Sequence, residues 1–396
     1  AASGTLAQII PPSLVLIIMA DQLGRSVGDM YKGAMIPGLV LSAIYAGYVF
    51  LITIVKPDAA PALPKEARTL GSGVASLLLV IVAAAGVFYA ASLWIKSIHP
   101  DMDADNNAVW SASIAILFSY VLALVNQKLK LGMLSHLASQ VVIVLVPPLA
   151  LIFLVLGTIF VGIATPTEGG AMGALGALIL AISKRKLNLT LLKQAMDTTA
   201  KLSSFVVFIL LGARVFSLTF YGVNGHTWVE HMLTSLPGGQ VGFLLVVNLF
   251  VFVLAFFLDF FELAFIIIPL LGPAAEKLGI DLIWFGIILG VNMQTSFMHP
   301  PFGFALFYLR SVAPKSEYID RVTNKLMAPI TTGQIYMGAI PFVVIQVIMV
   351  GLVILIPSMV MVYKSGGVHL DQKQMEQQLK EIAPPAGDDA PPPLKF

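Results

Sequence analysis

The sequence contains no cysteine among its 396 residues, and only 11% of them are charged. The lack of cysteine excludes disulfides and thiolate metal sites. Soluble proteins carry about 25% charged residues, so this chain has too few charges to cover a globular surface. Because 58% of the residues are hydrophobic and the net charge is only +2, we expect lipid to be the solvent for much of the chain, and nucleic-acid binding is not indicated.

Enzyme signatures are also missing. His226, Glu230 and His231 do not have the HExxH spacing of a zinc protease. Ser3 is followed by Gly4 but has no identifiable base nearby in the sequence. No phosphate-binding GxxxxGK[ST] loop occurs, which argues against ATP-driven transport by this chain. We therefore expect no catalytic residues and no enzyme activity.

Long apolar stretches are what the chain has instead. A membrane-spanning helix needs about 17–25 such residues. Seven stretches qualify: Gly33–Val55, Gly71–Lys96, Ala108–Val125, Ser139–Gly162, Leu202–Tyr221, Val241–Leu271 and Gln334–Val362. Glu168–Ile182 is shorter and is expected to be a half-span. The fold class predicted from this pattern is an all-α polytopic membrane protein.

A proline-paired sequence occurs twice in the chain. The first copy is SGTLAQIIPPS at residues 3–13, and the second is QTSFMHPPFG at residues 294–303. Each copy is followed by a second matching block, GDMYKGAMIP at residues 28–37 and GQIYMGAIP at residues 333–341. Two copies of one broken, polar unit in a hydrophobic chain predict a transporter built from structural repeats, with its binding site at the repeated units.

Each Pro-Pro tip is predicted to join two short helices into a re-entrant hairpin. The hairpins are residues 1–20, whose first half is largely missing because the chain opens inside the motif, and residues 281–311. Irregular backbone at membrane depth is tolerated only where it faces protein or a water-filled cavity. The basic loops are Lys56–Arg68, Lys128–Lys130, Lys184–Lys186 and Arg310–Lys325. Placing them in the cytoplasm puts the repeats in opposite orientations, as inverted repeats require.

The chain is predicted to divide into four regions. Residues 1–55 end the first repeat, residues 56–140 hold peripheral scaffold helices and an interfacial helix, residues 141–363 form the second repeat with a broken helix at 334–362, and residues 364–396 are a polar, Pro-rich tail that is mostly disordered. Asn126–Gln140 and Leu187–Lys201 mix Lys with regularly spaced Leu, as surface-lying amphipathic helices do. The alternative is that these two segments only connect spans.

The tips carry the candidate sodium and substrate ligands. These are Ser3, Gly4 and Thr5 in the first copy and Asn292, Gln294, Thr295 and Ser296 in the second. Oxygens of hydroxyls, amides and unwound carbonyls suit a hard cation such as Na⁺, and half-helix ends add negative partial charge. Helix N-termini starting at Pro12 and Pro301 would instead face a substrate anion. The alternative interpretation is that these side chains only cap the short helices.

Two prolines lie inside the helices that follow the tips. Pro37 and Pro341 are predicted to break these helices and to complete the two ion sites, or else only to kink them. Thr165 and Glu168 flank Pro166 in the pattern of a capping box, with a direct ligand role as the alternative.

Ionisable residues deep in spans are usually functional or paired. Asp259 and Glu262 are three apart and are expected to share a helix face, and Arg214 is expected to pair with them or to meet a substrate carboxylate. His299 lies at the second tip, where it is either a packed polar residue or a proton relay.

These segments resemble the large membrane subunit of tripartite ATP-independent periplasmic (TRAP) transporters over most of residues 1–345. The resemblance lies in residues 2–13, 36–38, 162–168, 259–262 with Pro269, 278–281 and 292–304. The sequence departs from the family in two places. His299 stands where the family usually has Thr, and the family has a longer N-terminal region.

The resemblance implies an elevator-type importer of a small organic acid, often a carboxylate, in the bacterial inner membrane. It implies Na⁺ as the coupling ion and no organic cofactor. The implied partners are a periplasmic substrate-binding protein and a small four-helix membrane subunit. A stand-alone sodium-coupled carboxylate carrier is the first alternative, and an intramembrane enzyme, a scaffold or a channel are the others. The sequence does not name the substrate.

Overall fold

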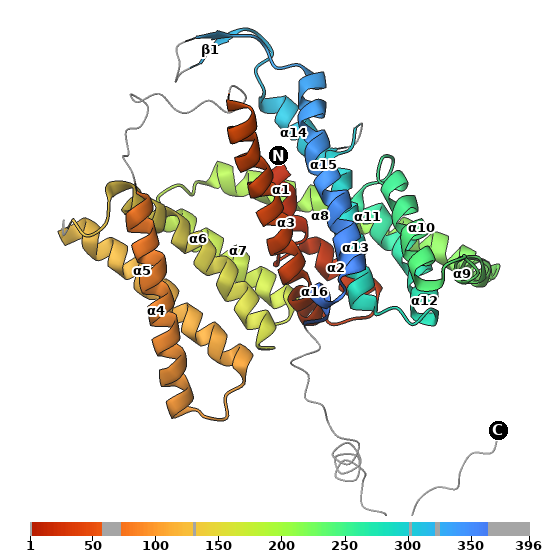
Figure 1. Ribbon diagram of the computed structural model, residues 1–396, viewed down its shortest axis with the longest axis horizontal. Helices are drawn as coiled ribbons and strands as arrows, with labels where there is room; N and C mark the ends of the chain where they lie inside the picture. The colour runs from red at the N-terminus through yellow and green to blue at the C-terminus, as the bar shows by residue number, and fades with distance from the viewer. Residues whose placement is uncertain (1, 58–72, 130–131, 301–302, 321–324, 363–396) are drawn as a thin grey trace, which may run out of the picture.

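The computed structural model describes residues 2–57, 73–129, 132–300, 303–320 and 325–362, and every structural statement below concerns these residues. Helices dominate them (Figure 1). The sheet that they contain is a single antiparallel pair, β1 (Tyr318–Ile319) and β2 (Leu326–Met327). The predicted tail, residues 364–396, lies outside the described residues. The four-region division and the orientation in the membrane stay predictions.

The helical elements follow in chain order. They are α1 (Ala2–Thr5), η1 (Leu6–Gln8), α2 (Leu14–Gln22), α3 (Val27–Val55), α4 (Val74–Ile98), α5 (Ala104–Leu129), α6 (His136–Phe160), α7 (Pro166–Ser183), α8 (Leu189–Gly222), α9 (Gly225–Thr234), α10 (Gly239–Leu254), α11 (Phe260–Glu262), the π-helical turn η4 (Leu263–Ile267), α12 (Ile268–Lys277), α13 (Leu282–Met293), η5 (Gln294–Met298), α14 (Phe304–Val312), α15 (Thr332–Leu355) and α16 (Ser358–Met361).

Six helices of the described residues are long and apolar enough to cross a membrane. They are α3, α4, α5, α6, α8 and α15, and a seventh span results if the α9–α10 pair, bent by 119°, counts as one. Six of the seven predicted stretches overlap these helices, which confirms an all-α polytopic membrane protein. The predicted half-span Glu168–Ile182 lies in α7, which has 18 residues and is not among the six.

The prediction of one span over Val241–Leu271 was wrong. Helix α10 ends at Leu254, and a new helix begins after Asp259. The Asp259 carboxylate accepts a hydrogen bond from the Glu262 N–H at 3.0 Å, and the Glu262 carboxylate accepts one from the Asp259 N–H at 3.1 Å. This capping box satisfies two backbone N–H groups, and it therefore favours a new helix start at Asp259 over one continuous apolar helix.

The two predicted surface helices are not separate elements either. Asn126 closes a turn between α5 and α6, because its Oδ1 accepts hydrogen bonds from the N–H groups of Met133 (3.0 Å) and Leu134 (3.2 Å). Asn126–Gln140 therefore connects two spans, as the alternative held. Leu187–Lys201 covers the start of α8, which is capped by the Asn188 side chain and then runs without interruption to Gly222.

The predicted breaks at Pro37 and Pro341 were also wrong. Both α3 and α15 continue through their prolines. A proline removes one backbone hydrogen bond, and membrane helices tolerate that loss where neighbouring helices support them. At the next residue, Gly38, an added Cβ would lie 2.9 Å from the Ile10 side chain. The first tip therefore packs directly against α3 at the proline.

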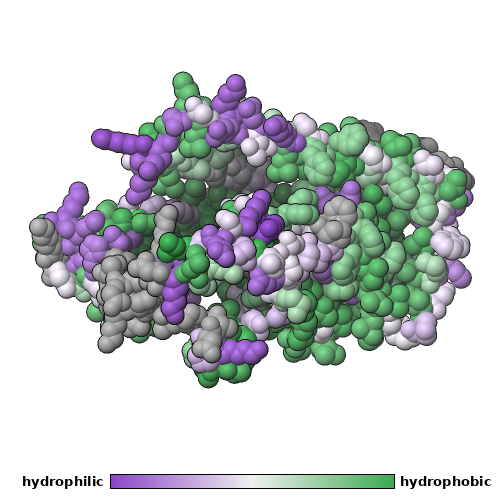
Figure 2. Space-filling model, turned by 90° about the horizontal axis from the view of Figure 1, so that it is seen from above, coloured by the Kyte–Doolittle hydropathy of each residue, from purple (hydrophilic) through white to green (hydrophobic). Residues whose placement is uncertain are grey.

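The described residues pack around two main hydrophobic clusters. The larger one gathers buried side chains from α2, α3, α10, α12, α13 and α15, and the smaller one gathers Val80, Ala123, Leu134, Ala138 and Val142 from α4 to α6. Figure 1 shows α4 to α7 grouped to one side of α3 and α15. From above, apolar side chains cover much of the visible surface, and polar ones gather toward one side (Figure 2). Lipid is therefore the expected solvent for the exposed apolar faces.

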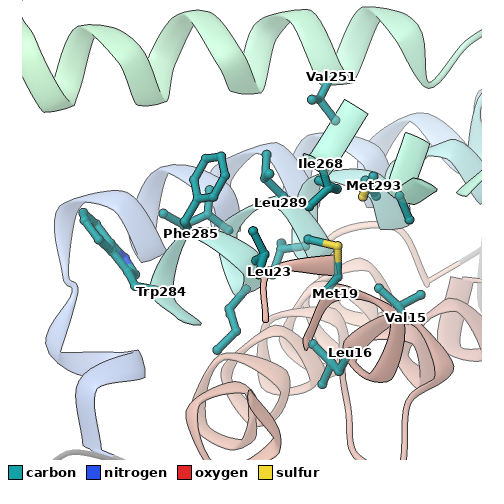
Figure 3. Close-up of a cluster of buried hydrophobic side chains, with 14 of the residues drawn as sticks. Val15, Leu16, Met19, Leu23, Val251, Ile268, Trp284, Phe285, Leu289 and Met293 are labelled. Carbon is teal, nitrogen blue, oxygen red and sulfur yellow. The ribbon is translucent and has the colours of Figure 1, made fainter. Parts of the chain in front are cut away.

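Helix α13 lies at the centre of the larger cluster. All of its 12 residues are buried. Figure 3 shows Phe285, Leu289 and Met293 of this helix close to Met19 and Leu23 from α2 and its C-terminal end. Glycines permit this close packing: a Cβ on Gly286 would lie 2.9 Å from the Leu23 side chain, and one on Gly33 of α3 would lie 2.8 Å from the Ile287 side chain. Small residues of this kind let membrane helices approach one another.

Gly303 offers a test of the packing around the second tip. A Cβ at this position would lie 2.8 Å from the His299 backbone oxygen and 3.0 Å from the Phe297 backbone oxygen. Because backbone atoms cannot move aside as a flexible side chain can, we expect Gly303→Ala to cost about 1–3 kcal/mol of stability. Gly351→Ala on α15 is the control, since nothing lies within 4 Å of its added Cβ. Equal thermal unfolding midpoints for both variants in detergent would contradict the packing.

Candidate functional site

Both Pro-Pro tips are breaks between short helical elements. The first lies between η1 and α2, and the second lies between η5 and α14. The helix after the first tip begins at Leu14, so the predicted start at Pro12 was two residues too early; after the second tip α14 begins at Phe304, and Pro301 lies outside the described residues. Residues before a proline favour extended backbone. Ser13 is then the better cap, and its Oγ accepts a hydrogen bond from the Leu16 N–H at 3.2 Å.

The two tips touch through one buried hydrogen bond. The Gln294 Nε2 donates to the Thr5 Oγ1 at 3.1 Å, although the residues are 289 positions apart. Thr5 is 4% exposed and Gln294 is 1% exposed. When the two copies are aligned on their proline pairs, Thr5 and Gln294 occupy equivalent positions. This bond therefore joins corresponding positions of the two proline-paired motifs.

Unpartnered polar atoms surround this bond. Within the described residues, the Gln294 Oε1, the Tyr45 hydroxyl on α3 and both amide atoms of Gln346 on α15 are buried and make no hydrogen bond of good geometry. The Tyr45 hydroxyl faces the side chains of Thr5 and Gln346. We call Thr5, Tyr45, Gln294 and Gln346 the central polar cluster. A buried polar group left without a partner costs about 1–3 kcal/mol, so the cluster is suited to a bound ion or water.

Sequence reasoning missed Tyr45 and Gln346. Gln346 is the one polar side chain of α15 after Pro341, whereas Tyr45 lies between Ser42 and Tyr48 on α3, and neither belongs to the repeated blocks. Gln346 is 0% exposed. An uncharged polar side chain in the middle of a membrane helix usually bonds across a helix interface. That rule could have identified Gln346 as a candidate residue from the sequence. Its proximity to Tyr45, however, depends on how α3 and α15 pack.

A second set of buried polar side chains lies at the second tip. The Asn292 Nδ2 donates to the backbone oxygen and the Oδ1 of Asn248 on α10, at 2.7 and 3.0 Å. The Thr295 and Ser296 hydroxyls donate to the backbone oxygens of Asn292 and Met293, both at 2.7 Å. These bonds use the hydroxyl protons and leave oxygen lone pairs that can still accept or coordinate. Asn248 was not anticipated from the sequence.

The first tip borders a cavity of about 900 Å³. Ser3 lines this cavity, together with residues of α3, α14 and α15. Ser3 and Gly4 are exposed, unlike Thr5, whose hydroxyl donates to the Ala2 backbone oxygen at 2.8 Å. Tyr45 belongs both to the cavity lining and to the central polar cluster. The cavity and the cluster are therefore neighbours.

The deep ionisable residues are not gathered at the tips. Asp259 and Glu262 cap α11 together, which confirms that they are mutual neighbours. Arg214 is exposed on α8 and lines a different cavity, of about 680 Å³, with Asp21 and Tyr221. Within the described part of the chain, no ion pair joins Arg214 to Asp259 or Glu262.

His299 is packed among aromatic rings. It is 2% exposed, stacks on Phe256 with ring centroids 4.0 Å apart, and meets Phe252 edge-on at 4.7 Å. Within the described residues, neither ring nitrogen makes a hydrogen bond of good geometry, and the Ala255 backbone lies beside the ring. A proton relay needs a group that can take up or release a proton within hydrogen-bond reach, so this arrangement favours the packed interpretation.

Thr165 and Glu168 form the predicted capping box at the start of α7. The Thr165 Oγ1 accepts from the Glu168 N–H at 3.3 Å, and the Glu168 Oε2 accepts from the Thr165 N–H at 2.8 Å. Both residues are exposed, and α7 packs against α6. Their structural role as a cap is confirmed.

Comparison with known proteins agrees with this architecture. Residues 1–359 match the sequence model of the family described as "Tripartite ATP-independent periplasmic transporter, DctM component". The C4-dicarboxylate TRAP transporter large permease protein of Pseudomonas aeruginosa is 25% identical over 311 residues, which are 78% of this chain and 57% of that protein. Its Vibrio cholerae counterpart is 26% identical over 79% of this chain and 59% of that protein.

Other similar proteins are named for other substrates. The sialic acid TRAP transporter permease protein SiaT of Haemophilus influenzae is 24% identical over 52% of this chain and 31% of that protein. The isethionate TRAP transporter permease protein of Oleidesulfovibrio alaskensis is 24% identical over 83% of this chain and 41% of that protein. The chain thus spans about half the length of the curated relatives that it matches.

The bond between the tips can be measured with a double-mutant cycle. Thr5→Val and Gln294→Leu each remove one partner, and the double variant removes both. We expect a coupling free energy of about 0.5–1.5 kcal/mol from unfolding of the purified protein in detergent. Thr5→Val combined with Thr331→Val at the α15 cap is the control, because Thr331 bonds only within its own cap region. Additivity in the Thr5–Gln294 cycle would show that the tips do not hold each other.

Proposed function

The chain belongs to the DctM component family of tripartite ATP-independent periplasmic transporters, and on that basis we propose that it is part of the large permease subunit of a sodium-coupled importer of a small organic acid. The family is one of transporter permeases and not of enzymes. The six apolar spans and the family support a multi-pass protein of the bacterial inner membrane.

The contact between the two tips is the observation that carries this proposal. Oxygen atoms from four separate elements meet there: Thr5 from the first tip, Gln294 from the second, Tyr45 from α3 and Gln346 from α15. Hard cations prefer uncharged and charged oxygen ligands. A bound Na⁺ would satisfy oxygens that otherwise stay unpartnered, and it would hold the tips and the two long helices together.

Further sodium ligands are available beside the tips. Ser3 and Gly4 extend the first site, and the buried Asn292, Thr295 and Ser296 extend the second. Although the helices do not break at Pro37 and Pro341, each proline still leaves the carbonyl four residues earlier without its helical donor. These carbonyls belong to Gly33 and Met337. The prolines therefore contribute by freeing an oxygen and not by ending a helix.

The substrate is proposed from the relatives and not from a cationic pocket. The names of the similar proteins refer to C4-dicarboxylates, sialic acid and isethionate, all of which are organic anions. A small organic acid, most often a carboxylate, is therefore the proposed cargo. We propose that a periplasmic binding protein delivers it and that a small membrane subunit accompanies this chain, as in tripartite transporters.

An elevator movement is proposed from the way the core is divided. The tips, α3 and α15 belong to the larger hydrophobic cluster, whereas α4 and α5 belong to the smaller one. Helix α6 joins the two parts, and its Phe160 meets Tyr31 of α3 edge-on at 6.2 Å. Two parts with separate cores can shift as rigid bodies with little internal repacking. We propose that the part with the tips moves and that the α4–α7 part stays in place.

Sodium dependence of uptake tests the proposed function. We expect Thr5→Ala and Thr295→Ala, each in the full-length transporter with its binding protein, to raise the Na⁺ concentration for half-maximal uptake about tenfold, as the loss of one oxygen ligand implies. The measurement is substrate uptake by proteoliposomes over a Na⁺ series.

Thr198→Ala on α8 is the matched control. Its hydroxyl also donates to a carbonyl of its own helix, at 2.8 Å from the Gln194 oxygen, but it is exposed and outside the site. Unchanged Na⁺ dependence in both tip variants would reject the assignment of these side chains. Uptake that needs no binding protein would identify a stand-alone carrier instead.

A further inference from the structure

Another cavity lies outside the proposed transport site, between α5, α6 and α7. Its volume is about 580 Å³, within the range of about 300–1,000 Å³ that is typical of small-molecule sites. Apolar side chains such as Ile116, Leu117, Ala150 and Phe153 make up most of its lining. Because α5 and α6 are long and apolar enough to span the membrane, lipid hydrocarbon is the solvent that can fill this cavity.

One end of this cavity is basic. Lys184 lines it directly, and Arg185 and Lys186 follow in the turn that ends α7. We call these three residues the basic turn. All three side chains are exposed, and within the described residues none of them forms an ion pair. Cations are favoured at any helix C-terminus, so the charges alone do not indicate a ligand, but here the first of them, Lys184, lines an apolar cavity.

The backbone of the basic turn adds an independent observation. Arg185 has a φ of +54°, in the left-handed region, and it shares this feature with only one other non-glycine residue of the described chain, Asn224. Its N–H bonds to the Ile182 oxygen at 2.8 Å, and the Lys186 N–H bonds to the Ala181 oxygen at 3.0 Å. Glycine is the usual residue at such a helix end, and an L-residue there costs about 1–2 kcal/mol. Without a bound ligand, arginine at this position therefore stabilises the turn less than glycine would.

We propose that this cavity binds an anionic phospholipid. One acyl chain occupies the apolar lining between α5 and α6, and the phosphate lies against Lys184 and Arg185. Guanidinium groups bind phosphate oxygens in a bidentate manner, and basic pockets between membrane helices attract anionic headgroups. Charge complementarity at the basic turn thus selects the headgroup, and the apolar lining holds the chain. The proposal does not depend on the sodium site.

Arg185→Gly separates lipid binding from structural support. The substitution removes the guanidinium and also relaxes the left-handed residue, so it should not lower the thermal stability of the delipidated protein. We expect about fivefold less phosphatidylglycerol to remain bound, measured by native mass spectrometry of the full-length protein from vesicles of phosphatidylglycerol and phosphatidylcholine. Asn224→Gly is the matched control, because it relaxes the other left-handed residue without removing a charge, and it should keep wild-type lipid.

Ala150→Phe tests the apolar half of the site. The larger side chain should fill the cavity and lower the retention of both lipids, whereas Arg185→Gly should affect the anionic lipid alone. The proposal fails if both variants keep phosphatidylglycerol at the wild-type level, or if the wild type retains the two lipids equally. It also fails if a cysteine placed at Ala150 in this cysteine-free chain reacts equally with and without phosphatidylglycerol but is shielded when the small membrane subunit is added.

Discussion

The structure depends on the requirement that non-helical backbone inside a membrane must not face lipid. The chain interrupts its helices at two proline pairs, and each interruption exposes backbone groups that lipid cannot satisfy. The two tips meet this requirement by facing each other, and the Thr5–Gln294 bond joins them at equivalent positions. Helices α2, α3, α13 and α15 then surround the tips, and the two side chains in contact, Thr5 and Gln294, are buried although Ser3 and Gly4 beside them are exposed.

Close helix packing follows from the same requirement. Lipid tails are as apolar as leucine, so burial of apolar surface alone does not drive membrane helices together. The contacts around α13 depend on glycine, since added Cβ atoms at Gly33 and Gly286 would come within 3 Å of neighbouring side chains. Polar bonds between helices supply the remaining specificity, as Asn292 does by reaching Asn248 on α10. Within the described residues, the Gln346 amide makes no such bond of good geometry, which is why it belongs to the proposed sodium site.

Hydropathy and repetition predicted the spans and the tips but not how the spans end. Six apolar stretches were identified correctly because length and hydrophobicity alone define a spanning helix. The helix start at Asp259 and the turn that Asn126 closes were missed because one polar side chain that caps a helix or closes a turn has little effect on the mean hydropathy of a long window. The meeting of Tyr45 with Gln346 depends on tertiary packing between α3 and α15, which no local pattern contains. The prolines misled for a related reason: their effect on a helix is decided by what packs against it.

The division of the core into two clusters links the proposed transport site to the proposed lipid site. A moving part must keep its own packing intact while it slides against a part that stays in place. Here the tips and their helices share the larger cluster, and α4 and α5 share the smaller one. A part that resists movement needs firm anchoring, and its anchors can only be neighbouring protein or lipid. A basic turn beside an apolar cavity on that part would provide such an anchor, because it holds a headgroup at the membrane surface and a chain between the helices.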